Sequence, residues 1–212
     1  MAYNISMYVP GHFRLEDRAL VRELMRRNPF ATIVSNGEAG PFATHLPVLL
    51  EDGESLVIAA HMAKANPHWK LFEARSPVLT IFHGPHAYVS PKLYVAEGSV
   101  PTWNYATVHC YGVPELIEDE EEALRHVQTV VRTFDANLEQ KRPASMEESM
   151  LRRMLAGIVA FRIPVDRFEA KLKLNQNKAL PDRNAVKKAM SESPDLFERQ
   201  VGELMVEVFD VS

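Results

Sequence analysis

Short apolar runs of β-branched and aromatic residues, separated by turn signals, constrain the fold of this chain most strongly. Three such runs follow one another at residues 30–35, 41–50 and 55–60. The intervening pairs, Asn36-Gly37 and Asp52-Gly53, are typical of hairpin turns. Strands joined so closely pair antiparallel, and a meander of this kind curls into a barrel or an open sheet.

Helical periodicity flanks and interrupts the predicted strands. Further strands are predicted at residues 78–82, 86–90, 106–116 and 157–163, and residues 91–103 are predicted to form a long loop. Helices are predicted at residues 15–28, 67–74, 118–134 and 148–155, and from residue 182 onward. The pattern favours an α+β protein built on an antiparallel barrel over a doubly wound parallel sheet. We predict a barrel domain over residues 1–165, with a helical insert at about 118–155, and a C-terminal helical extension over 166–212.

Composition narrows the class of protein. The 212 residues are 46% hydrophobic and 25% charged, which is ordinary for a globular protein, and no apolar run is long enough to span a membrane. The first ten residues lack the pattern of a signal peptide, and the single Cys110 suits a reducing compartment, so we expect a cytoplasmic protein. The net charge of −4, without a basic stripe, argues against general nucleic-acid binding.

An anion-binding arrangement is predicted where the third strand ends. Asn66 can cap the helix that begins at Pro67, and Lys64 lies just before it. A helix N-terminus and an ammonium group both attract phosphate. On local features alone, a plain helix cap and a solvated surface lysine explain these residues better. The polar residues 44–47 on the preceding strand add weight, because they are expected to lie beside this end.

Signals for metal binding and for covalent catalysis are weak. His83 and His86 flank a Gly-Pro pair that indicates a turn, no His-Glu-x-x-His helix exists, and one cysteine cannot build a zinc thiolate site. There is no Gly-x-Ser-x-Gly motif, and Cys110 lies within a predicted strand, where a buried inert thiol is expected. We therefore predict no metal ligands and no catalytic side chains.

Two further segments each allow two interpretations. Trp103 and Tyr105 can form a wall for a planar ligand, or they can be core or interface aromatics. The polar residues 169–178 can supply amide and ammonium donors to a ligand, or they can be a solvated connector.

Taken together, these motifs resemble the PaiB-type FMN-binding negative transcriptional regulators. The similarity extends from about residue 7 to about residue 190. One departure is Asn175, where relatives usually carry Ser. The motifs that carry the resemblance are Thr44-His-Leu-Pro47, His61 through Asn66-Pro67-x-Trp69, Phe82-x-Gly-Pro-x-Ala-Tyr-Val-Ser-Pro91, Val100-Pro-Thr-Trp-Asn-Tyr105, Val108-His109 with Tyr111-Gly112, and Lys173-Leu-Asn-Gln-Asn177.

The resemblance implies a split β-barrel like that of flavoproteins related to pyridoxamine phosphate oxidase, which are homodimers with FMN at the subunit interface. It implies that Lys64 and Asn66 hold the FMN phosphate. The other residues implied to contact the cofactor are Thr44, His45, Leu46 and Pro47 beside the isoalloxazine and ribityl groups, His61, Trp69, Lys173 and Gln176, and Trp103 and Asn104 from the partner chain.

The family implies negative regulation of transcription, with DNA contacted directly or through another protein. Two alternatives stay open from the sequence. One is a flavin-dependent oxidoreductase acting on a small substrate, because FMN itself transfers electrons and the protein need only orient it. The other is a haem-binding split-barrel protein.

Overall fold

The computed structural model describes residues 6–51, 53, 55–135 and 148–210. Its helices are α1 (Arg18–Arg27), α2 (Glu120–Phe134), α4 (Glu148–Leu155), α5 (Leu180–Ser191) and α6 (Leu196–Asp210), with the 3-10 helices η1 (Gly11–Phe13), η2 (Pro67–Ala74) and η3 (Pro91–Leu93). Its strands are β1 (Arg14–Leu15), β2 (Phe30–Gly37), β3 (Gly40–Pro47), β4 (Leu49–Glu51), β5 (Val57–Ala63), β6 (Val78–Val89), β7 (Thr102–Gly112), β8 (Glu115–Leu116), β9 (Ile158–Pro164) and β10 (Arg167–Lys173).

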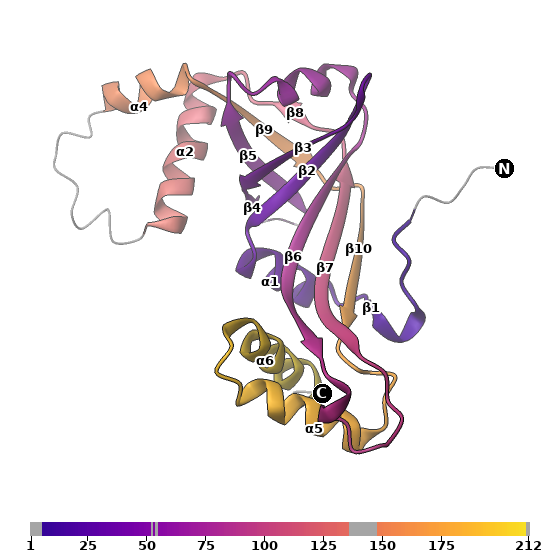
Figure 1. Cartoon of the computed structure of the whole chain (residues 1–212). Helices are drawn as coiled ribbons and strands as arrows, with labels where there is room; N and C mark the ends of the chain where they lie inside the picture. The colour runs from indigo at the N-terminus through magenta and orange to yellow at the C-terminus, as the bar shows by residue number, and fades with distance from the viewer. Residues whose placement is uncertain (1–5, 52, 54, 136–147, 211–212) are drawn as a thin grey trace. The chain divides into compact units, whose positions relative to one another are not determined.

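The strands form two sheets (Figure 1). The six-stranded sheet has the order β1-β10-β7-β6-β2-β3, and the four-stranded sheet has the order β4-β5-β9-β8. The pairs β2–β3 and β4–β5 are antiparallel, as their short connections require, and the distant strands β5 and β9 also pair antiparallel. The predicted α+β class with antiparallel sheets is therefore confirmed. Among the described strands, each sheet has two free edges.

The chain divides into two compact units. The first unit comprises Met1–Arg27, His83–His109 and Glu169–Ser212, and the second comprises Asn28–Phe82 and Cys110–Phe168. Large apolar side chains fill each of them. The fully buried ones of the second unit are Ile33, Ile58, Met62, Phe82, Phe161 and Ile163, and those of the first are Val21, Met25, Leu174, Met190 and Met205. The predicted boundary at residues 165–166 stays a prediction.

The second predicted strand is divided between the two sheets. It was expected to run over residues 41–50, but β3 ends at Pro47 and β4 begins at Leu49 in the other sheet. Pro47 has no N–H for a sheet ladder, and the N–H of Val48 donates to the carbonyl of Pro29 at 2.9 Å. The change of sheet therefore follows from one proline and one loop contact.

Two predicted turns are wrong. The β2–β3 hairpin turns at residues 38–39, because Asn36 pairs with Pro41 and Gly37 with Gly40, which adopts φ +120°. Gly84 and the proline after it lie inside the continuous strand β6. A Cβ on Gly84 would lie 2.8 Å from the Cβ of Ala106, so glycine permits close approach of β7 here and marks no turn.

Strand limits near the ligand motifs also differ from the prediction. β7 begins at Thr102, so the predicted loop is shorter. Residues 167–173 form β10, which the sequence analysis treated as part of a polar segment. The predicted break at residues 142–147 and Asp52 of the second hairpin turn lie outside the described residues.

Candidate functional site

Asn66 caps the N-terminus of η2 as predicted. Its side-chain oxygen accepts the N–H of His68 at 3.0 Å, and Pro67 occupies the first helical position. Since Pro67 has no N–H and the N–H of His68 is already bonded, the start of this helix offers fewer donors to an anion than a bare N-terminus would. The ammonium of Lys64 is therefore the strongest attraction for phosphate at this end.

Lys64 and Trp69 line a cavity of about 410 Å³ in the second unit. The Trp69 indole N–H donates to the carbonyl of Lys64 at 3.0 Å, which fixes the ring beside the lysine backbone. Arg152 also lines the cavity, but Glu120 and Glu121 bind its guanidinium at 3.0 and 2.6 Å. Lys64 forms no ion pair with any described residue. The aliphatic lining comes from Ile117, Ala123, Leu155, Ala156, Ile158, Val159 and Ala160.

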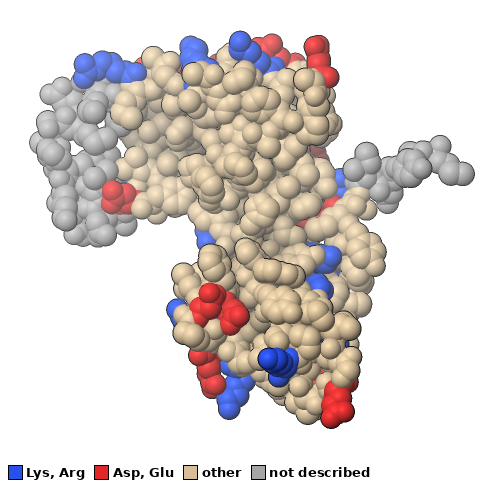
Figure 2. Space-filling model, in the orientation of Figure 1, with Lys and Arg blue, Asp and Glu red and all other residues tan. Residues whose placement is uncertain are grey.

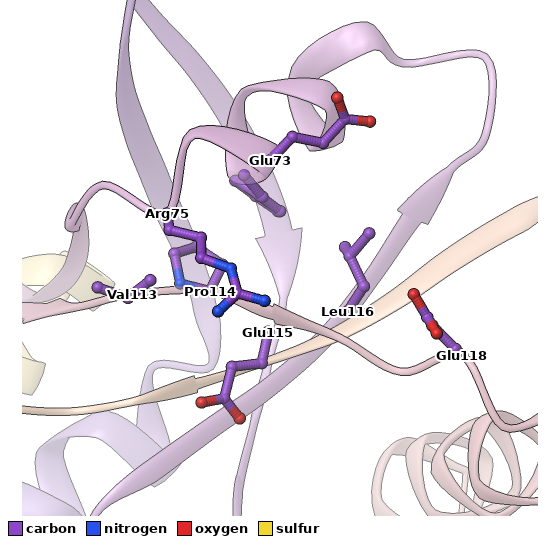
Figure 3. A pocket seen from close by; sticks show the side chains of 8 residues that line it. Glu73, Arg75, Val113, Pro114, Glu115, Leu116 and Glu118 are labelled. Atoms are coloured by element: carbon purple, nitrogen blue, oxygen red, sulfur yellow. The ribbon is translucent and has the colours of Figure 1, made fainter.

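A second cavity of the same unit, of about 360 Å³, is less suited to an anion. Arg75 extends from the end of η2 toward Pro114 and Glu115 (Figure 3). Glu73, Glu115 and Glu118 also line this cavity, so its formal charge is −2. The Lys64 cavity, with two cations and two carboxylates, is formally neutral. A phosphate dianion is repelled less there, and we take the Lys64 cavity as the candidate site.

His68 is a buried residue of the site that the sequence analysis missed. Its Nδ1 lies 2.7 Å from the Thr44 hydroxyl, and its Nε2 lies 2.8 Å from that of Ser35. Asn66 Nδ2 donates to the same Thr44 hydroxyl at 3.2 Å. Burial lowers the pKa of His68, so the ring is neutral and accepts at one nitrogen while donating at the other. These bonds tie β2 and β3 to the start of η2.

Replacing His68 with alanine is expected to destabilise the protein by about 2 kcal/mol or more, because it removes the partner of the buried Ser35 hydroxyl, removes one of the two partners of the Thr44 hydroxyl, and opens a cavity. Chemical denaturation measures this change. In a double-mutant cycle with Thr44→Val the coupling is expected to be about 1 kcal/mol. Additive effects of the two substitutions would contradict the bonded arrangement.

The four predicted ligand residues on β3 lie on an edge strand. Thr44 and Leu46 are half-buried, whereas His45 and Pro47 are exposed. The hydroxyl of Thr44 is occupied by Asn66 and His68. The Nδ1 of His45 lies 2.9 Å from the Thr32 hydroxyl, and its ring stacks on Phe30 at a centroid distance of 6.2 Å. His45, Leu46 and Pro47 thus lie on the edge strand of the six-stranded sheet, with the His45 ring held against β2.

His61 contacts another histidine. Strand β5 sets it opposite Ala160 of β9, and its Nδ1 lies 3.1 Å from Nε2 of His126 on α2. Burial lowers the pKa of both rings, and that of His126 falls to about 4 with further contributions from His61 and from the positive charge of Arg162. Both imidazoles are therefore neutral at neutral pH.

Stability is expected to fall as the pH drops below about 6.5 toward 4. The unfolded chain protonates these histidines near their ordinary pKa, while the folded chain resists protonation, so the unfolded state binds more protons in that window. His126 alone contributes at most about 3 kcal/mol, which is fully present above the window and lost below it. Urea denaturation across this range measures the slope. His126→Gln should flatten the slope, and an unchanged slope would contradict the assignment.

The other predicted site residues lie in the first unit. Trp103 is exposed and makes an edge contact with Tyr88 at 6.2 Å, whereas Asn104 is fully buried, with its amide nitrogen 3.8 Å from the sulfur of Met205. Lys173 donates to the Thr102 hydroxyl. The exposed ring of Trp103 is thus available to a planar ligand, which is the role predicted for this residue, whereas Asn104 packs against α6.

Gln176 is already used within its own segment. Its amide nitrogen donates to the carbonyl of Leu172, and its oxygen accepts the N–H of Leu174, both at 2.7 Å. Asn175, the departure from the family pattern, adopts φ +65° and donates to the Tyr94 hydroxyl at 2.8 Å. Asparagine tolerates this left-handed backbone better than serine, which gives a local reason for the change.

Burial determines the chemistry of Cys110. Burial raises the pKa of the Cys110 thiol to about 12, so it stays protonated and is a poor nucleophile, as predicted.

None of the described helices combines the length and the apolar character needed to cross a membrane.

Comparison with known proteins decides the family. The family model described as "Putative FMN-binding domain" matches residues 7–167. The chain belongs to this FMN-binding family. It is also 33% identical over 203 residues to the protease synthase and sporulation protein PAI 2 of Bacillus subtilis (strain 168), covering 94% of this chain and 96% of that protein. The predicted membership of the PaiB-type family is confirmed, and FMN is the cofactor that this membership assigns.

Solved structures with low sequence identity share the fold. The FAD and heme binding protein from Mycobacterium smegmatis has a TM-score of 0.62 at 15% identity, covering 81% of this chain and 78% of that one. The flavocytochrome Anf3 from Azotobacter vinelandii has a TM-score of 0.60 at 15% identity, covering 76% of this chain and 69% of that one. The predicted split-barrel architecture is confirmed.

The residues around Lys64 fit FMN chemically. The Lys64 ammonium, without an ion-pair partner in the described part of the chain, suits the phosphate, and Trp69 with the aliphatic lining suits an apolar ring system. The cavity volume lies within the range of about 300 to 1,000 Å³ that is usual for cofactor sites.

Proposed function

We propose that this protein binds FMN through Lys64 and the Asn66-capped start of η2, and that it regulates transcription in its flavin-bound form. The observation that carries the binding proposal is Lys64, which lines the cavity next to a helix start and whose ammonium forms no ion pair with the described residues. Asn66 orients the backbone there, and His68 supports Asn66 through Thr44. Bound FMN would supply one- or two-electron redox chemistry, and the chain's own residues hold and orient it.

A comparison of FMN with riboflavin tests this proposal. The two flavins differ only in the phosphate, so FMN is expected to bind about tenfold more tightly or better if Lys64 holds that group. Fluorescence titration of flavin-free protein measures both affinities. Equal affinities would refute a phosphate-binding role for this end of η2.

We also propose that the protein is a homodimer with its flavins at the subunit interface. The open edge of β3 supports this, because residues 40–47 are largely exposed and Phe30 and Phe42 present apolar surface beside them. Exposed edge strands with apolar neighbours pair readily with another chain. His45, Leu46 and Pro47 would then contact the isoalloxazine and ribityl groups, and the partner chain would contribute Trp103. Analytical ultracentrifugation should give the mass of two chains.

We propose further that regulation acts through another protein and not through direct DNA contact. Three of the four basic residues of α5 and α6 are engaged within the first unit: Arg183 stacks on Phe209 at 4.5 Å, Lys187 bonds Asp210 at 2.5 Å, and Arg199 donates to the carbonyl of Ser193 at 2.8 Å. In Figure 2, the described Lys and Arg residues on the visible face lie scattered among acidic and uncharged ones. Direct DNA binding needs a basic surface.

A gel shift with promoter DNA at low salt is expected to show no complex with the purified FMN-loaded protein. Phosphate contacts are strongest at low ionic strength, so binding of any strength would be seen there. A salt-sensitive shift would refute indirect action. A shift that appears only after a cell extract is added would support it.

A further inference from the structure

Two histidines from different elements point ring nitrogens at each other outside the proposed phosphate site. His61 comes from β5 and His126 from α2, with Nδ1 and Nε2 3.1 Å apart and the ring planes at 79°. Two neutral imidazoles can share one proton across such a contact. If the proton between the two rings moves to the other nitrogen of its own ring, both facing nitrogens have a free lone pair. One cation can then bind both lone pairs.

The nitrogen separation suits a divalent transition-metal ion. Zinc lies about 2.0 to 2.1 Å from an imidazole nitrogen, so two such ligands at a tetrahedral angle are about 3.3 Å apart. The observed 3.1 Å corresponds to a ligand–metal–ligand angle of about 100°. The separation therefore admits the ion once both rings turn so that their lone pairs converge on it. Burial keeps both rings neutral at neutral pH, which a metal ligand requires.

The charged groups near the His61–His126 pair have a slightly negative net charge. Arg162 of β9 disfavours a cation, since its positive charge acts on His126. Glu51 of β4 and Glu122 of α2 both bind that guanidinium, so the three groups sum to −1. Glu122 lies one helical turn before His126 on the same face of α2. A bound ion would compete with Arg162 for the Glu122 carboxylate.

We propose that His61 and His126 form a binding site for a divalent transition-metal ion of the zinc class. Among residues 6–51, 53, 55–135 and 148–210 no group of three or more metal-binding side chains is assembled, so water completes the coordination unless Glu122 turns inward. The ion joins α2 to the four-stranded sheet, beside the cavity that Ala123 and Ala160 line. The sequence analysis predicted no metal site, because residues 65 positions apart carry no local spacing signal.

Zinc titration of the untagged, metal-free protein tests the site. Isothermal titration with zinc chloride at neutral pH should give one ion per chain in the wild type. His126→Gln and His61→Gln should each weaken zinc affinity about tenfold or more, and Glu122→Gln should weaken it less. Cu²⁺ bound in place of zinc should show hyperfine coupling to two nitrogens, reduced to one in His126→Gln. Zinc should raise Tm in the wild type and not in that variant.

The exposed His86, in the first unit, provides the matched control. His86→Gln should bind zinc as tightly as the wild type. Circular dichroism establishes whether each variant is folded, and Glu122→Gln tests the site with both histidines retained. Equal zinc affinity in the wild type, His61→Gln and His126→Gln, or a copper spectrum without nitrogen coupling, would overturn the proposal and leave a simple imidazole–imidazole hydrogen bond. The resemblance implies a flavin contact for His61 but not for His126, so all titrations use flavin-free protein and their result does not depend on FMN.

Discussion

Replacing Lys64 with alanine is expected to weaken FMN binding roughly 10- to 150-fold while leaving riboflavin binding unchanged. A hydrogen bond between an ammonium and a phosphate contributes about 1.5 to 3 kcal/mol. Lys64 is exposed, so solvent screening places the effect toward the lower end. The Asn66 cap already binds the N–H of His68, and the lysine therefore carries most of the attraction for phosphate. Fluorescence titration of each variant with both flavins measures the change.

Lys70 provides the matched control for this substitution. It is an exposed lysine on η2, with its ammonium 5.9 Å from the Trp69 ring centre, and it does not line the cavity. Lys70→Ala should therefore change the preference for FMN over riboflavin by less than about twofold. Equal losses of FMN affinity in the two variants would indicate a diffuse charge effect. An unchanged preference in Lys64→Ala would place the phosphate elsewhere.

Replacing Gly112 with alanine is expected to destabilise the protein by about 3 kcal/mol or more. A Cβ at this position would lie 2.0 Å from the carbonyl oxygen of Pro164 and 3.0 Å from a methyl carbon of Ile163. The closest atom belongs to the backbone, so no side-chain rotation relieves the overlap. The gain from a less flexible unfolded chain, about 0.4 to 1 kcal/mol, is too small to offset it.

Thermal unfolding followed by circular dichroism should show this loss as a decrease in Tm of roughly 6 to 12 °C. Gly11→Ala is the control, because a Cβ on Gly11 meets no atom within 4 Å. Its effect should stay within about 0.5 kcal/mol. A Gly112→Ala variant as stable as Gly11→Ala would contradict the close approach of β7 to the end of β9.

Local signals in the sequence predicted the parts of the site that depend on neighbouring residues. Asn66 followed by Pro67 is a cap whose bonds form within three residues, and the structure confirms it. The order of strands and helices also followed from periodicity. The segment over residues 167–173 alternates apolar and polar residues as a strand should, but the dense polarity of residues 169–178 led us to predict ligand donors or a solvated connector there.

Contacts between distant segments could not be predicted in the same way. Nothing near His68 in the sequence indicates that its ring bonds Ser35 and Thr44, and nothing near His61 indicates His126. Gln176 was predicted as a flavin donor because its amide is polar, yet both of its polar atoms bind backbone groups. Hydrogen-bond partners are set by which elements pack together, and periodicity does not specify this.

The sequence by itself determined the antiparallel α+β class, the capped start of η2 with its lysine, and the resemblance to the FMN-binding family, because each depends on short-range patterns. Only the tertiary structure decided that β3 and β4 belong to different sheets and that Lys64 lines a cavity. It also decided that the polar side-chain atoms of Gln176 bond backbone groups of the neighbouring residues. The physical reason is that side chains many residues apart meet only when strands pair and helices pack. Their burial and bonding then decide which polar groups remain available to a ligand.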